Sequence, residues 1–119
     1  MSKYNNLVWS DEFDGKELNR DVWTYEIGYI RNNELQYYTD SPENAYLEDG
    51  CLVIEAKKTD DPERPYTSAS VNTKHKQTFL YGRLEMRAKL PYGKGTWPAF
   101  WTLGDNHWGD PEPNEPGVP

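Results

Sequence analysis

The sequence is rich in side chains that could act as acids and bases. It contains 20 Asp and Glu residues and two His residues. Two carboxylates can divide the roles of acid and nucleophile only when they lie close together in different environments. Asp11 and Glu12 fail that test on one strand, because consecutive side chains point to opposite faces. Glu85 is flanked by Arg83 and Arg87 on one face of its segment, so a salt-bridge ladder and a binding role are both open for it.

A second group of side chains is suited to ligand binding. Trp97 and Trp101 are four residues apart, which on an extended strand places them on one face at a distance of roughly 13 Å. Sugars stack their C–H faces on indole rings and exchange hydrogen bonds with Asn, Glu and Arg. A strand face that bears both indoles and Arg87 could therefore bind a polysaccharide. Packing in the core is the alternative, because most Trp side chains are largely buried.

Composition limits the kind of protein further. The 119 residues are enough for one domain, and the net charge of −7 argues against nucleic-acid and anionic-membrane partners. Cys51 is the only cysteine, so an intrachain disulfide and a cysteine-rich zinc site are excluded, and we expect its side chain to be buried. The first residues lack the apolar core of a signal peptide, and no run reaches the length of a membrane span.

Strands are expected almost throughout. Apolar and polar residues alternate over 84–90, and 51–57 is rich in β-branched residues. Asp49-Gly50 is a strong hairpin-turn signal between 45–48 and that second segment. Further turns are expected at Asp14-Gly15, Asp60-Asp61-Pro62 and Tyr92-Gly93-Lys94-Gly95, and no helical stripe is evident. The pattern predicts an all-β, antiparallel chain.

The final third of the chain divides into two parts. Residues 96–104 read as a strand with an edge position or bulge at Pro98. Four prolines in the last nine residues prevent a sheet interior, so we expect 107–119 to be a surface loop or a frayed end. Because a sandwich of many short strands usually spans about 200–250 residues, we expect residues 1–106 to form only about half of such a domain.

Four motifs occur in an order that resembles glycoside hydrolase family 16, in particular its laminarinase-like and lichenase-like β-glucanases. They are Trp9-Ser10-Asp11-Glu12-Phe13, Asn32-Asn33-Glu34-Leu35-Gln36-Tyr37-Tyr38-Thr39, Tyr81-Gly82-Arg83-Leu84-Glu85-Met86-Arg87 and the run from Leu90 to Trp101. The resemblance covers roughly residues 4–106, which correspond to the N-terminal half of the family domain. It implies a concanavalin-like jelly-roll sandwich with a glucan-binding cleft.

The resemblance also implies a retaining mechanism, in which one Glu attacks the anomeric carbon and a second protonates the leaving oxygen. In the family these residues form a Glu-x-Asp-x-x-Glu signature on one strand, shortly after the run that here ends at Trp101. No strand with that signature is identified in this sequence. We therefore expect this chain to supply cleft residues for β-1,3- or β-1,3-1,4-glucan hydrolysis, and to be inactive alone.

Positions that match the family motifs are expected to bind the substrate. They are Asn32, Glu34, Arg87, Trp97 and Trp101, although Arg31 stands where many laminarinases have Gly. A structural calcium ion is also implied, with Glu12 and Gly50 in the places of two family ligands. Calcium prefers such oxygen ligands, but another family ligand comes from the C-terminal part, so we expect weak binding by this chain.

Three interpretations remain open on this evidence. The chain could be part of a secreted β-glucanase completed by a second chain or a C-terminal half. It could instead be a noncatalytic glucan-binding module that keeps the Trp-lined face. Finally, half a jelly roll exposes sheet edges and one side of its core, so the chain could depend on its complement to fold.

Overall fold

The computed structural model describes residues 3–104, and this range contains strands but no helix. Seven short strands follow one another along the chain: β1 (Thr24–Tyr25), β2 (Gln36–Tyr38), β3 (Ala45–Glu48), β4 (Cys51–Ile54), β5 (Lys57–Lys58), β6 (Tyr66–Ser68) and β7 (Val71–Asn72). The prediction of an all-β chain is confirmed. The terminal segment 107–119, expected to be a loop or a frayed end, lies outside the described residues.

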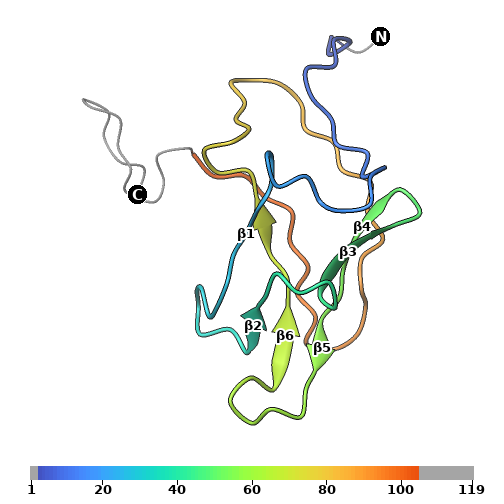
Figure 1. Ribbon diagram of the computed structural model, residues 1–119. Coiled ribbons are helices and arrows are strands. Elements are labelled where there is room, and N and C mark those ends of the chain that lie inside the picture. The colour runs from blue at the N-terminus through green and yellow to red at the C-terminus, as the bar shows by residue number, and fades with distance from the viewer. Residues whose placement is uncertain (1–2, 105–119) are drawn as a thin grey trace. The chain divides into compact units, whose positions relative to one another are not determined.

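The strands form three small sheets. Strand β1 pairs with β7, and β3 pairs with β4. Strand β6 lies between β2 and β5 (Figure 1). Three of the four strand pairs in the described range are antiparallel, as predicted, whereas β2 and β6 run parallel. A parallel pair needs a long crossover, and here the chain from β2 to β6 passes through the β3–β4 hairpin and β5.

The β3–β4 hairpin is formed as the sequence predicts. Its register opposes Tyr46 to Val53 and Leu47 to Leu52. Asp49 and Gly50 both have positive φ, 52° and 71°, which is the backbone of the two-residue turn that fits the twist of paired strands. The Asp-Gly pair therefore fixes both the position and the register of this hairpin.

All seven strands belong to one compact unit, Asn5–Thr78, and the other described residues, 3–4 and 79–104, belong to a second unit. Two strand predictions for the second unit are wrong. Residues 84–90 and 96–104 were expected to be strands, but neither forms one in the described structure. Alternating apolar and polar residues allow a segment to bury one face in a sheet. A strand also needs a neighbouring strand that pairs with its backbone hydrogen-bonding groups. The turn expected near Gly93 is present, with Thr96 N donating to Gly93 O at 3.4 Å.

The core of the described chain is small. Leu18, Ala45 and Ala69 are its buried apolar side chains. Cys51 is exposed, contrary to the expectation of a buried thiol, and it is the first residue after the hairpin turn. No helix within residues 3–104 has the length and apolar character needed to cross a membrane.

Asn44 is the one buried polar side chain among the described residues, with 3% of its surface exposed. Its Nδ2 donates to Glu55 O and to Thr67 Oγ1, each at 3.0 Å, and its Oδ1 accepts from Thr39 Oγ1 at 2.6 Å. These partners follow β4, lie in β6 and follow β2, respectively. Asn44 therefore links the hairpin to the three-stranded sheet, which also carries the loop described next.

Candidate functional site

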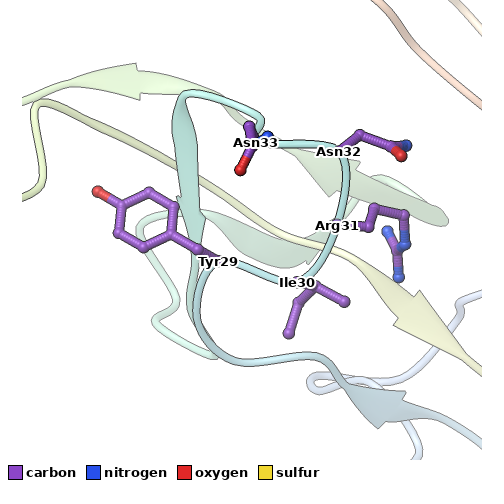
Figure 2. Close-up of a pocket in the computed structure, with 5 residues that line it drawn as sticks. All are labelled: Tyr29, Ile30, Arg31, Asn32 and Asn33. Carbon is purple, nitrogen blue, oxygen red and sulfur yellow. The ribbon is translucent and has the colours of Figure 1, made fainter.

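The motif that contains Asn32 and Glu34 lies on a loop between two paired residues, Gly28 and Tyr38. Gly28 N donates to Tyr38 O at 2.9 Å, and Tyr38 N donates back to Gly28 O at 3.0 Å. The loop from Tyr29 to Asn33 lines a pocket of about 260 Å³ (Figure 2). We call residues 29–33 the pocket loop. Its base is fixed by the same strand, β2, that follows it in the chain.

Two consecutive asparagines turn the pocket loop. Asn32 and Asn33 have φ values of 60° and 52°, a left-handed conformation that Asn adopts more readily than most residues. Glu34 N closes the turn by donating to Arg31 O at 3.2 Å. Both Asn side chains are exposed, and in Figure 2 Asn32 and Tyr29 leave the loop in different directions. The Asn-Asn pair thus presents two carboxamides on a turn that few other residues would adopt without strain.

Arg31 contacts a residue outside the pocket loop that no sequence motif links to it. Its guanidinium donates to Glu26 Oε2 at 2.5 Å, and both side chains are less than a fifth exposed. Ser70 Oγ donates to the other oxygen of Glu26 at 2.5 Å. Burial on its own would lower the pKa of Arg31, but the hydrogen bond and negative charge of Glu26 outweigh it and raise the pKa. Arg31 thus stays protonated within the pocket loop and pairs with Glu26.

Glu34 lies just before β2 and contacts a polar side chain on that strand. Gln36 Nε2 donates to Glu34 Oε2 at 2.7 Å and to Tyr38 Oη at 3.0 Å. Gln36 and Tyr38 share a face of β2 because they are two residues apart, and the hydrogen bond from Gln36 adds Glu34 to this group. Glu34 is half-buried within it. The structure therefore brings Asn32 and Glu34 together beside one loop, although their role in sugar binding stays a prediction.

The other expected substrate-binding residues lie in the second unit, where they are solvent-exposed. Trp97 is 90% exposed and Trp101 is 56% exposed, so packing in the core is excluded for Trp97 in the described structure. Arg87 is exposed as well. Arg83 forms an ion pair with Glu85, as the salt-bridge interpretation predicts. The part of Arg87 and the two Trp residues in binding glucan stays a prediction.

The acidic spacing Glu-x-Asp-x-x-Glu does occur in the sequence, at Glu12, Asp14 and Glu17, a match that the sequence reasoning overlooked. All three residues are exposed, and none lies on a strand. Phe13, between the first two, has φ of 54°, so the segment is bent where the family signature needs an extended strand. These three residues therefore lack the extended strand that would orient their carboxylates toward a substrate.

The same segment approaches the expected calcium ligand Gly50. A Cβ built on Gly50 would lie 3.7 Å from Asp14 Oδ1 and 3.9 Å from the main-chain oxygen of Glu12. Oxygen atoms of these types suit calcium. Among residues 3–104, no three Asp, Glu, His or Cys side chains gather in a way that could hold a metal. The two oxygen donors near Gly50 are therefore of the kinds that calcium accepts, but within residues 3–104 they do not form a complete metal site.

Comparison with known proteins relates this chain to glucan-active proteins. Residues 1–109 match the family model described as "Beta-glucan synthesis-associated protein SKN1/KRE6/Sbg1". The chain is 45% identical over 115 residues to glucan endo-1,3-beta-glucosidase A1 of Niallia circulans, and 50% identical over 103 residues to a beta-glucanase of Rhodothermus marinus. These alignments cover 82% and 83% of this chain but only 17% and 36% of the relatives. The chain thus spans about a third or less of these proteins.

Solved structures agree with the sequence comparison. The X-ray structure of the laminarinase from Rhodothermus marinus superposes with a TM-score of 0.59 at 44% sequence identity. The match covers 64% of this chain and 32% of that chain. The predicted jelly-roll class is therefore confirmed for the matched part.

Proposed function

Because the chain belongs to glycoside hydrolase family 16, through the related SKN1/KRE6/Sbg1 group whose family model it matches, we propose that it binds β-glucan within a retaining endo-β-glucanase. The proposed substrates are β-1,3- and β-1,3-1,4-linked glucans. The chain supplies cleft residues for them. Catalysis requires a nucleophile and an acid that its described residues do not place together.

The pocket loop carries this proposal. Asn32 is exposed on a loop whose base is fixed by the Gly28–Tyr38 pair. A carboxamide offers two donors and one acceptor oxygen, which matches the mixed donor and acceptor character of sugar hydroxyls. Asn32 lies in the left-handed turn, and its side chain is exposed. The loop can therefore recognise a neutral sugar by hydrogen bonds instead of by charge.

The exposed indoles of Trp97 and Trp101 support the same function from the second unit. Contiguous large apolar side chains that are exposed on a protein usually mark a binding site for a ligand or a partner. Indole rings bind the C–H faces of sugars, whereas carboxamides bind the hydroxyls at the rim.

The proposal is tested by titrating the 119-residue chain with laminaritetraose in a calorimeter. We expect Asn32→Gly to weaken binding about tenfold, since a lost hydrogen bond to a neutral partner with desolvation costs about 1–2 kcal/mol. Glycine accepts the left-handed conformation at residue 32, so the variant removes the carboxamide and keeps the turn. Asn6→Gly changes an exposed Asn outside the pocket loop, and this control should bind like the wild type.

A wild-type chain that shows no affinity for laminaritetraose or for a mixed-linkage tetrasaccharide would contradict glucan binding. Hydrolysis is tested on the same sample with laminarin and lichenan. We expect no reducing sugar to be released, because the covalent route needs the two carboxylates. Turnover that persists after repurification, and is lost in Glu12→Gln or Glu17→Gln, would show that the acidic spacing near Phe13 is catalytic.

A noncatalytic role in glucan binding is the second candidate. It is favoured by the family model, whose description names glucan synthesis-associated proteins instead of hydrolases. The two candidates separate when the longer protein that contains this sequence is assayed. An enzyme would release oligosaccharides from laminarin, whereas a binding module would retain affinity and leave the polymer intact. An extracellular location and completion of the fold by further polypeptide belong to the first candidate.

A structural calcium ion is part of this proposal. Glu12 would contribute its main-chain oxygen, Gly50 its carbonyl, and Asp14 a carboxylate that approaches the same glycine. Bound calcium would join this segment to the hairpin turn and so stabilise the folded state. Thermal unfolding with excess calcium and with a chelator measures this. We expect a higher midpoint with calcium, and no difference between the two conditions would contradict the site.

A further inference from the structure

A cluster of two tyrosines and one arginine lies beside the pocket loop and has no part in the proposed function so far. Tyr29, the first residue of the loop, contacts Tyr37 edge to face, with ring centroids 5.2 Å apart and an angle of 85°. Arg64 lies over the Tyr37 ring, with Cζ 3.9 Å from the centroid. Tyr29 Oη donates to Glu63 O at 3.0 Å. Tyr29 is thus held by its ring edge and by its hydroxyl.

The segment that supplies Glu63 and Arg64 is itself well fixed. Thr59 N donates to Pro65 O at 2.8 Å, and Thr59 Oγ1 donates to Arg64 O at 2.5 Å. Glu63 N donates to Asp61 Oδ1 at 2.9 Å. Residues 59–65 join β5 to β6, and β6 pairs with β2, the strand that carries Tyr37. We call residues 59–65 the supporting turn.

The pocket loop is therefore held at two points of its own length. Arg31 is held by Glu26, and Tyr29 is held by the supporting turn and by Tyr37. Asn32 and Asn33 follow directly and are exposed. Arg64 contacts the face of the Tyr37 ring, and Tyr37 in turn forms the edge-to-face pair with Tyr29. The contacts that lead from the Arg64 side chain to the pocket loop therefore run through the two tyrosines.

We propose that Arg64, acting through Tyr37 and Tyr29, is a positioning residue that sets the orientation of the pocket loop for glycan binding. This inference rests on the proposed glucan-binding function. An arginine over an aromatic face and an edge-to-face ring pair each contribute a modest, directional attraction. Together they select one rotamer of Tyr29 and hence one path of the backbone into Asn32. Loss of Arg64 frees Tyr37, and the loop then spends part of its time in orientations that do not bind.

The test compares Arg64→Ala with Arg64→Lys in the 119-residue chain. We expect Arg64→Ala to weaken laminaritetraose binding about three- to tenfold, and Arg64→Lys to restore it to within about twofold, because lysine keeps a cation over the ring. In the ligand-free protein, the side-chain amide NMR resonances of Asn32 and Asn33 should shift in Arg64→Ala and return in Arg64→Lys. A role in stability alone would leave those resonances in place.

Arg20 provides a matched control. Its Cζ lies 4.6 Å from the centroid of Tyr25 in the same unit, so Arg20→Ala removes a comparable contact away from the pocket loop. We expect its affinity and amide resonances to match the wild type. The inference is overturned if Arg64→Ala binds like the wild type, or if Arg20→Ala weakens binding equally. If the wild-type chain does not bind laminaritetraose, the proposed function fails, and the amide resonances still decide whether Arg64 sets the loop.

Discussion

Residues 5–78 and residues 79–104 have similar sequence character but different structures. Both contain alternating apolar residues, aromatic side chains and glycine-containing turns. The first region forms seven strands, whereas the second forms none in the described chain. Trp23 in the first region packs against Trp9 and Phe13, whereas Trp97 in the second is almost fully exposed.

The difference shows that an alternating pattern of apolar and polar residues is not sufficient to form a strand. In the first region each strand has a neighbour, and Asn44 joins two of the sheets through buried hydrogen bonds. In the second region the described residues supply no strand to pair with 84–90. Four experiments test this contrast, beginning with the one expected to have the largest effect.

Replacement of Asn44 should weaken the contact between the sheets of the first region. Asn44→Ala removes three side-chain hydrogen bonds, and Glu55 O and Thr67 Oγ1 lose this donor in a partly buried place. We expect the free energy of unfolding to fall by about 3 kcal/mol, as two or three lost buried hydrogen bonds imply. Urea unfolding followed by circular dichroism measures it. An unfolding curve that coincides with that of the exposed-site control Asn6→Ala would show that Asn44 does not hold the sheets together.

The two tryptophans give a direct test of packing. Trp23 is half-buried, and its Nε1 donates to Asp11 Oδ2 at 2.8 Å. We expect Trp23→Ala to lower the free energy of unfolding by about 2–3 kcal/mol, less than the loss from a fully buried Trp. Trp97→Ala should change it by less than about 0.5 kcal/mol, because the side chain is exposed. An equal loss of unfolding free energy at the two positions would show that the two regions do not differ in side-chain packing.

The hairpin turn tests how far local sequence determines the first region. Gly50 has φ of +71°, where a Cβ is disfavoured, so Gly50→Ala should cost about 1–2 kcal/mol. Amide hydrogen exchange should show the loss in β3 and β4. Gly15→Ala is the matched control, since a Cβ there would meet only ordinary contacts near 3.6 Å. Unchanged exchange in β3 and β4 would mean that tertiary contacts, not the turn, hold the hairpin.

The smallest effect is expected at the ion pair of the second region. Arg83 and Glu85 are 52% and 70% exposed, and solvent and salt screen such a pair. We expect Glu85→Gln to lower the free energy of unfolding by less than about 0.5 kcal/mol, with no further change in 1 M salt. A loss above about 1.5 kcal/mol in urea unfolding would show that this region packs more tightly than its exposure indicates.

Much of the candidate site could be predicted, because its signals are local. The Asn32-Asn33 pair suits a left-handed turn, and Gln36 and Tyr38 are two residues apart on one strand face. The supports of the loop could not be predicted in this way. Ser70 is 44 residues from Glu26, and Glu63 is 34 residues from Tyr29, so no spacing pattern links them. A sequence reader could have noticed the acidic spacing at Glu12, but not the bend at Phe13 that disables it.

The sequence by itself determined the all-β class, the Asp49-Gly50 hairpin with its register, and the family to which the chain belongs. Those features depend on alternation, on turn residues and on motif order, which are properties of neighbouring residues. Only the tertiary structure decided which alternating segments became strands, that Cys51 is exposed, and which distant residues hold the pocket loop. Such outcomes depend on hydrogen bonds and burial between remote segments, and a segment can gain these only where folding brings a partner beside it.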